Sequence, residues 1–184
     1  MIINIKNVKL NLASGTDIRS GWFNLDVVPK WPNTSRECDI IWDATIDNIP
    51  FTDNSANEIY AGYLLLHLPP IYHKQVLSEI RRVLNPGGIL LIGEVDMRIL
   101  FEKWLENPHD EYLSGLIWGE QGNLGNNGDY RLDKNIAQYD KHCHGFTQES
   151  LYKLLDENGF CDFERIKIHS EEVFYEMTIK ARKK

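Results

Sequence analysis

Apolar residues in this chain fall in short runs that polar residues, glycine or proline interrupt. Such runs occupy residues 8–13, 22–28 and 38–42, and a fourth starts at Asn57 and continues to Leu66. Runs of this length, closed by turn-forming residues, are typical of β-strands. We therefore expect four short strands in the first third of the chain.

A helical pattern replaces the strand pattern after Pro70, a residue that fits the first turn of a helix. Apolar residues recur three or four positions apart up to Leu84, and the Asn-Pro-Gly-Gly segment 85–88 ends the pattern. Residues 89–92 are then apolar without interruption, which is typical of a strand buried on both faces of a parallel sheet. This part of the chain predicts one helix followed by one central strand.

The second half of the chain continues with helical spacing. Helices are predicted over 97–106 and 110–118, and a further helix starts with Thr147 as its N-cap and ends at Gly159. Between them lies the glycine- and asparagine-rich segment 119–135. This segment predicts a loop, either a lid over a site or a surface loop.

Two β-rich runs close the chain, 161–169 and 173–179, and the short link between them predicts an antiparallel hairpin. Strands that alternate with helices and end in a hairpin predict an α/β fold, with a mostly parallel sheet and helices on its faces. The length of 184 residues, 42% of them hydrophobic, fits a single domain over 1–184. The link between the first two strands has only about nine residues, short for a helical crossover, so its helix should be reduced to a turn.

The charge of the chain narrows its partners. Asp and Glu number 27 against 20 Lys and Arg, a net charge of −7 that opposes binding to the phosphate backbone of nucleic acid. No apolar stretch approaches the roughly 20 residues that span a bilayer, and the N-terminus lacks a signal pattern, so we expect a cytoplasmic protein with no membrane partner. Cys38, Cys143 and Cys161 are odd in number and widely spaced, which indicates reduced thiols and no metal site. The oligomeric state stays open.

Small and acidic residues stand where the predicted parallel strands end, the edge at which such sheets bind ligands. They are segment 13–15, Asp26, Asp43 and segment 60–62. Backbone N–H groups followed by two separate carboxylates suit a nucleoside, with its ribose diol and exocyclic amine. The chain lacks the G-x-G-x-x-G turn of dinucleotide sites and the G-x-x-x-x-G-K-[ST] phosphate loop, which argues against both of those sites.

Several segments together resemble one known family. They are Leu10–Gly15 with Gly21–Asp26 (LNLASG and GWFNLD), Ile49–Ser55 (IPFTDNS), Leu77–Gly88 (LSEIRRVLNPGG) and His144–Phe160. This set is similar to class I S-adenosylmethionine-dependent methyltransferases, in particular a small, type 11-like branch, and it spans most of the chain. The sequence departs from that pattern where Ala13 replaces a glycine, Asn11 an acidic residue and Leu66 a glutamate.

The resemblance implies a Rossmann-like fold, S-adenosylmethionine as cofactor and S-adenosylhomocysteine as product. It places segment 13–15 beside the methionine part of the cofactor, Asp26 at the ribose hydroxyls, and Asp43 at the adenine amino group. Either aspartate could instead cap a turn. The cofactor-binding residues that the resemblance implies are Asn11, Ala13, Ser14, Gly15, Asp26, Val27, Asp43, Ala44, Tyr60, Ala61 and Gly62.

The resemblance also implies methyl transfer to a small-molecule or sugar-type acceptor. A hydroxyl or ammonium acceptor needs a general base, and His67 and His144 are the first candidates for it, although each could be structural. Further candidates are His142, Glu94 and Asp96. Gln121 and His144 are expected to contribute to the acceptor pocket. The replaced glycines leave one alternative, a methyltransferase-like binding module that has kept the fold and lost the cofactor.

Overall fold

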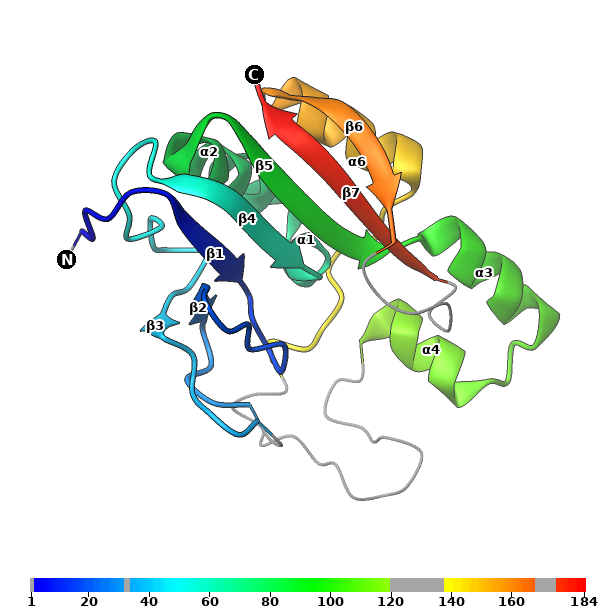
Figure 1. The fold of residues 1–184 in the computed structure, drawn as a ribbon. Coiled ribbons are helices and arrows are strands. Elements are labelled where there is room, and N and C mark those ends of the chain that lie inside the picture. Colours follow the sequence, from blue (N-terminus) through cyan, green and yellow to red (C-terminus); the bar gives the residue numbers. More distant parts are fainter. Residues whose placement is uncertain (1, 32–33, 120–137, 168–174) are drawn as a thin grey trace.

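The computed structural model describes residues 2–31, 34–119, 138–167 and 175–184, and these ranges contain a seven-stranded sheet (Figure 1). The strands are β1 (Val8–Leu12), β2 (Phe23–Asp26), β3 (Ile40–Ile41), β4 (Ala56–Gly62), β5 (Leu84–Val95), β6 (Phe160–Ile166) and β7 (Glu176–Lys183), in the spatial order β3-β2-β1-β4-β5-β7-β6. The pairs from β3 to β5 are parallel, and β7 runs antiparallel to β5 and β6. The predicted mostly parallel α/β sheet with a C-terminal hairpin is confirmed.

The helices follow the predicted spacing closely. They are α1 (Leu64–His67), the 3₁₀ helix η1 (Pro70–Tyr72), α2 (His73–Val83), α3 (Met97–Glu106), α4 (Glu111–Trp118) and α6 (Gln148–Glu157). Thr147 and Ser150 form a capping box, in which each side chain accepts the backbone N–H of the other, at 3.3 and 2.9 Å. Helices were expected at α2, α3, α4 and α6, and all four are confirmed. Within the described ranges, no helix is long and apolar enough to cross a membrane.

The strand order creates a switch point beside β1. The chain builds outward from β1 to β3 and then returns to place β4 on the other side of β1, so the loops that follow β1 and β4 leave in different directions. The fourth strand ends at Gly62, not at Leu66 as expected, because Tyr63 adopts a left-handed backbone conformation (φ 56°) and turns the chain into α1. The start of α1 therefore lies at the same edge of the sheet as the loop after β1.

The main core lies between one face of the sheet and helices α2 and α6, which Figure 1 shows behind the strands. Its buried residues include Leu77, Ile80, Leu151 and Leu155 from the helices and Leu10, Leu12, Ile59, Leu90 and Ile92 from the strands. Among the described residues, no helix covers the opposite face. Polar contacts occupy that face instead: Lys9 on β1 pairs with Glu58 on β4 at 2.8 Å.

This one-sided arrangement corrects one expectation. Residues 89–92 were expected to be buried on both faces, but only Leu90 and Ile92 are fully buried, while Ile89 and Leu91 are partly exposed on the other face. The expectation that helices cover both faces was wrong for the described chain. Leu90 and Ile92 are apolar because they form the core, and no helix of the described ranges lies over Ile89 and Leu91.

The crossover from β1 to β2 contains no helix, as its length predicted, and a buried asparagine holds it in place. Asn24 on β2 accepts the backbone N–H of Arg19 at 2.8 Å and donates to the Arg19 and Trp22 carbonyls at 3.1 and 3.2 Å. The Arg19 guanidinium then lies 3.5 Å from the centroid of the Tyr60 ring, on the open face. Hydrogen bonds to Asn24 thus fix this connection to the sheet, a role that the apolar side of a crossover helix has in other parallel sheets.

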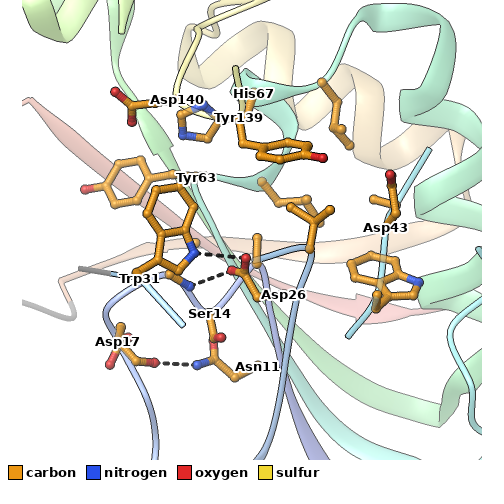
Figure 2. Close-up of a pocket in the computed structure, with 18 of the residues that line it drawn as sticks. Asn11, Ser14, Asp17, Asp26, Trp31, Asp43, Tyr63, His67, Tyr139 and Asp140 are labelled. Atoms are coloured by element: carbon orange, nitrogen blue, oxygen red, sulfur yellow. Dashed lines mark hydrogen bonds between the residues drawn. The ribbon is translucent and has the colours of Figure 1, made fainter. Parts of the chain in front are cut away.

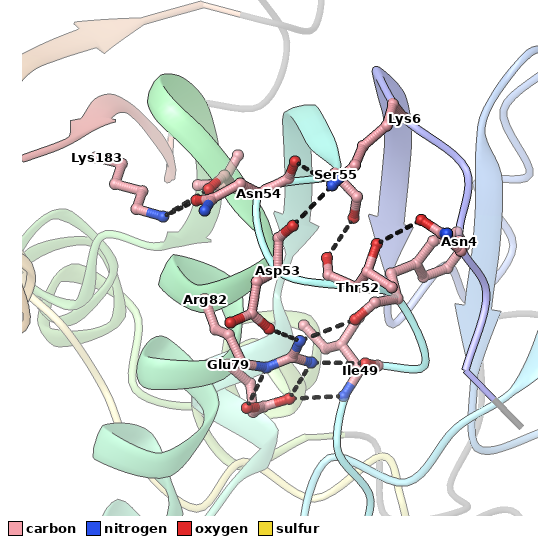
Figure 3. Close-up of polar contacts among 12 residues, drawn as sticks. Asn4, Lys6, Ile49, Thr52, Asp53, Asn54, Ser55, Glu79, Arg82 and Lys183 are labelled. Carbon is pink, nitrogen blue, oxygen red and sulfur yellow. Dashed lines mark hydrogen bonds and ion pairs between the residues drawn. The ribbon is translucent and has the colours of Figure 1, made fainter.

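Arg82 on α2 ties down the segment between β3 and β4 (Figure 3). Its guanidinium donates to the carbonyls of Ile49 and Phe51 at 2.9 and 2.8 Å and pairs with Glu79 and Asp53, both at 2.8 Å. Glu79 completes the arrangement by accepting the Ile49 N–H at 3.0 Å. The Glu and Arg of the LSEIRRVLNPGG segment therefore position the IPFTDNS segment, which explains why both motifs occur together.

Replacing Arg82 with alanine should lower the free energy of unfolding by about 2–3 kcal/mol, because two carbonyls and the Glu79 carboxylate lose their donor. Urea denaturation followed by circular dichroism measures this change. Arg98→Ala is the matched control: Arg98 makes an exposed pair with Glu102 on α3, and its loss should change stability too little to measure. Equal effects of the two substitutions would contradict the role given to Arg82.

Candidate functional site

A cavity of about 500 Å³ opens at the carboxyl ends of β1, β2 and β4 (Figure 2). Its walls come from the loop after β1, the end of β2, the segment after β3, the turn from β4 into α1, and residues 138–140. Ten of the eleven expected cofactor-binding residues line it: Asn11, Ala13, Ser14, Gly15, Asp26, Val27, Asp43, Ala44, Tyr60 and Gly62. The switch point of the sheet has therefore brought the sequence-predicted residues together.

The loop after β1 forms the floor of the cavity. Ala13 adopts the left-handed conformation (φ 50°) that a glycine would take without strain, and Gly15 follows with φ 51°. The Gly15 N–H donates to Asp26 Oδ2 at 2.8 Å, which fixes this loop to the end of β2. Ala13 thus adopts a conformation that favours glycine, the residue that it replaces in the family pattern.

Asp26 holds its surroundings and still has room for a ligand. The side chain is buried, and its Oδ1 accepts the Val28 N–H at 2.8 Å and the Trp31 indole N–H at 2.9 Å. Its Oδ2 accepts only the Gly15 N–H among the described residues, and a carboxylate oxygen has two acceptor positions. One position on Oδ2 therefore fits a ribose hydroxyl.

Two buried polar atoms in the floor lack a hydrogen-bond partner in the described chain. They are Asn11 Oδ1 and Ser14 Oγ, on residues that are fully buried and 3% exposed, respectively. An unsatisfied buried acceptor costs free energy, and most native proteins satisfy such atoms. Both residues line the cavity, so a ligand with donor groups, such as the ammonium of a methionine moiety, fits this floor.

Asp43 combines a local role with its place in the cavity. Its Oδ1 accepts the backbone N–H and the hydroxyl of Thr45 at 2.8 and 2.7 Å, as the turn-capping alternative predicted. Asp43 and Ala44 also line the cavity beside the buried Trp42. The capping bonds orient Asp43 and do not exclude it from the site.

His67, at the end of α1, lines the other side of the cavity. Its Nδ1 lies 3.1 Å from the Lys141 carbonyl, which only accepts hydrogen bonds, so Nδ1 carries the proton and Nε2 keeps a lone pair. Burial lowers the pKa of His67. The ring of His142 packs against it, with 4.9 Å between the centroids, and burial together with His67 lowers the pKa of His142 to about 4. Both imidazoles are neutral near pH 7.

Other expected site residues lie elsewhere. Ala61 is fully buried and does not line the cavity, because successive residues of β4 face opposite sides of the sheet. His144 packs against His73 and Phe146, with centroid distances of 5.3 and 4.7 Å, and is also not among the lining residues. Asp96 pairs with Arg165 at 2.9 Å.

Glu94 has a structural contact that its sequence position did not reveal. Its fully buried carboxylate accepts the N–H groups of Leu65 and Leu66 at 2.9 and 3.2 Å, at the first turn of α1. Burial raises the pKa of Glu94 to about 8, although the two backbone bonds oppose this rise. Glu94 thus supports the helix that carries His67 and does not line the cavity itself.

Some of the expected site residues lie outside the described ranges, and some residues that line the cavity were not predicted. Gln121 and most of the segment 119–135 are not described. The cavity residues that sequence reasoning missed include Trp31, Trp42, Tyr63, Tyr139 and Asp140. Trp42 is the last residue of its predicted strand, which is a usable signal, whereas Tyr63 falls inside the strand that was expected to continue to Leu66. Tyr139 and Asp140 are distant in sequence and gave none. No cluster of metal-ligating side chains occurs in the described chain.

Comparison with known proteins finds similarity to methyltransferases. A family of methyltransferase domains matches residues 24–92. Over 54 residues the chain is 43% identical to a sterol 24-C-methyltransferase of Gibberella zeae, a stretch that covers 29% of this chain and only 14% of that enzyme.

Solved structures of other proteins resemble 97% of the chain, and two of them illustrate the likeness. One is a SAM-dependent methyltransferase of Thermotoga maritima, described as a possible histamine N-methyltransferase, with 16% identity, a TM-score of 0.60 and 83% of that chain covered. The other is a SAM-dependent methyltransferase of Archaeoglobus fulgidus, with 12% identity, a TM-score of 0.61 and 86% of that chain covered. At these identities the likeness shows the fold, which is the Rossmann-like class I fold.

Glu94 should make stability depend on pH. Its pKa of about 8 in the folded chain lies above the ordinary value of 4.5, so the fold disfavours the ionised form. Stability should therefore be highest below about pH 4.5 for this group and fall as the pH rises toward 8. Urea denaturation at several pH values should show the wild type losing stability relative to Glu94→Gln over this range, and parallel profiles would contradict the assignment.

Proposed function

Because the chain carries a class I S-adenosylmethionine-dependent methyltransferase domain, we propose that it transfers the methyl group of this cofactor to a small acceptor held beside His67. The observation that carries the proposal is the cavity at the switch point. It joins a carboxylate at the end of β2 with two unsatisfied buried polar atoms in the floor. Its volume of about 500 Å³ lies within the usual range of ligand pockets.

The floor supplies the groups that a nucleoside with an amino-acid tail needs. Asp26 Oδ2 would accept a ribose hydroxyl, and Asp43 with Ala44 would form the wall beside the adenine; their positions at the cavity support these roles. Asn11 Oδ1 and Ser14 Oγ would meet the amino-acid part. When bound, S-adenosylmethionine supplies a methyl group on a positively charged sulfur, so the protein has mainly to align the acceptor and exclude water.

His67 is the base that the geometry favours. Its neutral Nε2 accepts the proton that the acceptor hydroxyl or amine releases as the new bond to the methyl carbon forms and the carbon–sulfur bond breaks. The Lys141 carbonyl keeps the tautomer fixed by accepting from Nδ1. His142 supports the ring by packing and adds no charge near pH 7.

The charges around the cavity indicate which charge the acceptor molecule carries. Four aspartates line it, namely Asp17, Asp26, Asp43 and Asp140, and no lysine or arginine of the described chain does. Arg19 pairs with Asp17 at 2.7 Å, so the other three aspartates supply most of the negative charge. A phosphorylated or carboxylated acceptor would meet repulsion there, whereas an amine or an unphosphorylated sugar hydroxyl would not. We therefore propose a neutral or cationic small-molecule acceptor. The solved structure described as a possible histamine N-methyltransferase is one relative in fold whose described acceptor is an amine.

Calorimetric titration with S-adenosylmethionine and S-adenosylhomocysteine tests cofactor binding. The wild type should bind both, and Asp26→Ala should weaken binding by about 10- to 100-fold, because a hydrogen bond to a charged group is lost. Glu102→Ala on α3 is the control and should bind like the wild type. Folded wild-type protein that binds neither compound would refute the enzyme and favour the non-catalytic binding module.

The role of His67 is tested by rates with an acceptor found in a screen of amines and unphosphorylated sugars. His67→Gln should lower the rate by roughly 10²- to 10⁴-fold and leave cofactor affinity nearly unchanged. Because the pKa of His67 lies below its ordinary value, the wild-type rate should stay constant down to about pH 6.5 and fall only at more acid pH. A variant that keeps the wild-type rate would rule out His67 as the base.

A further inference from the structure

We propose that Asn24 is a positioning residue, which turns the side-chain amide of Asn11 so that its oxygen faces the amino-acid part of the cofactor. The inference rests on the proposed function, since it needs S-adenosylmethionine or its product in the cavity. Asn24 itself does not line the cavity, and it acts only through Asn11.

The orientation of the Asn11 amide follows from its nitrogen. Asn11 Nδ2 donates to the Asp17 carbonyl at 2.6 Å and to Asn24 Oδ1 at 3.0 Å, so both of its hydrogens are used (Figure 2 shows the first bond). The opposite end of the amide, Oδ1, is then a buried acceptor without a partner in the described chain, on a residue that lines the cavity. A flipped amide would place N–H groups toward the cavity and an oxygen against two acceptors.

Asn24 is equally fixed. Its Oδ1 also accepts the Arg19 N–H at 2.8 Å, and its Nδ2 donates to Asp39 Oδ2 at 2.8 Å. The same Asp39 oxygen accepts the backbone N–H of Asn24 at 2.8 Å, and Asp39 pairs with Arg36 at 3.0 Å. Rotating the Asn24 amide would set its oxygen against a carboxylate and its nitrogen against two donors. Only one orientation satisfies every partner, and it fixes Asn11.

This arrangement explains why an amide stands at position 11. A carboxylate there would point one oxygen at the Asp17 carbonyl and at Asn24 Oδ1, two acceptors at hydrogen-bond distance. Asn11→Asp therefore adds a negative charge near the cationic ammonium of the cofactor and yet should weaken its binding. Charge alone predicts the opposite result.

The test compares two ligands of the wild type and of Asn24→Ala by calorimetry. S-adenosylhomocysteine has the amino-acid group, and 5′-methylthioadenosine has the same nucleoside and sulfur without it. Asn24→Ala should weaken binding of S-adenosylhomocysteine by about 10-fold or more, and of 5′-methylthioadenosine by less than about 3-fold. Asn24→Asp keeps an oxygen toward Asn11 and Arg19, so it should preserve the wild-type preference between the ligands even where it lowers stability.

Each outcome decides a different point. Wild-type protein that binds neither ligand overturns the proposed function and this inference with it. Wild-type binding of both ligands, together with equal weakening of both by Asn24→Ala, overturns only the positioning role and leaves Asn24 as a structural residue. Where Asn24→Ala does not fold, Asn11→Asp replaces it, and tighter binding of S-adenosylhomocysteine by that variant would refute the inference.

Discussion

The structure depends on how two adjacent parallel strands are joined without a helix. Parallel neighbours need a connection that runs back along the whole strand, and an apolar helix usually provides it. Here the connection between β1 and β2 is a loop, and the buried Asn24 amide satisfies its backbone from inside the sheet. Asn24 holds the Arg19–Trp22 end of this loop, while the bonds from the Ser14 N–H to the Leu25 carbonyl at 3.0 Å and from the Gly15 N–H to Asp26 at 2.8 Å hold the end that forms the cavity floor.

The face of the sheet that no described helix covers is also stabilised by polar contacts. Since no described helix lies on that face, its strand residues must be compatible with water, and the Lys9–Glu58 pair and the Arg19–Tyr60 contact meet that need. All the large apolar residues of α2 and α6 serve the other face. Within the described ranges, the fold keeps the strand order of the class I fold and buries its main core on one side of the sheet.

Much of the fold could be predicted from the sequence because the signals are local. Helical spacing and a Thr147 cap define α6, and the short crossover predicts that the first helix is missing. The covering of a sheet face is not a local property, so the apolar run 89–92 could not reveal that Ile89 and Leu91 stay partly exposed among the described residues. The turn at Tyr63 was missed for another reason: a left-handed tyrosine leaves no pattern in the sequence.

The site, too, contains residues that could be predicted from the sequence and residues that could not. Residues at strand ends, such as Asp26 and Asp43, are predictable because parallel strands bring their carboxyl ends together. Ala61 was included in the expected site although the two-residue period of a strand, applied to Tyr60 and Gly62, would have excluded it. Tyr139 could not be predicted, because it is distant in sequence from the strand ends and only the tertiary structure brings it to the cavity.

The acceptor side of the cavity is attached to the rest of the fold differently from the cofactor side, because the segment around residues 141–144 contacts α1 through the Leu66 carbonyl. The Leu66 oxygen accepts the N–H groups of both Cys143 and His144, at 2.6 and 3.1 Å, and with the His67–Lys141 bond it attaches this segment to α1. The His142 N–H also donates to the Trp118 carbonyl at 3.3 Å, but all these bonds belong to an irregular segment and not to a strand ladder. Such a segment can open in a local fluctuation whose free energy is far below that of global unfolding. Amide hydrogens on this wall should exchange with solvent long before those of β1, so an acceptor can enter and leave while the nucleoside side of the cavity stays ordered.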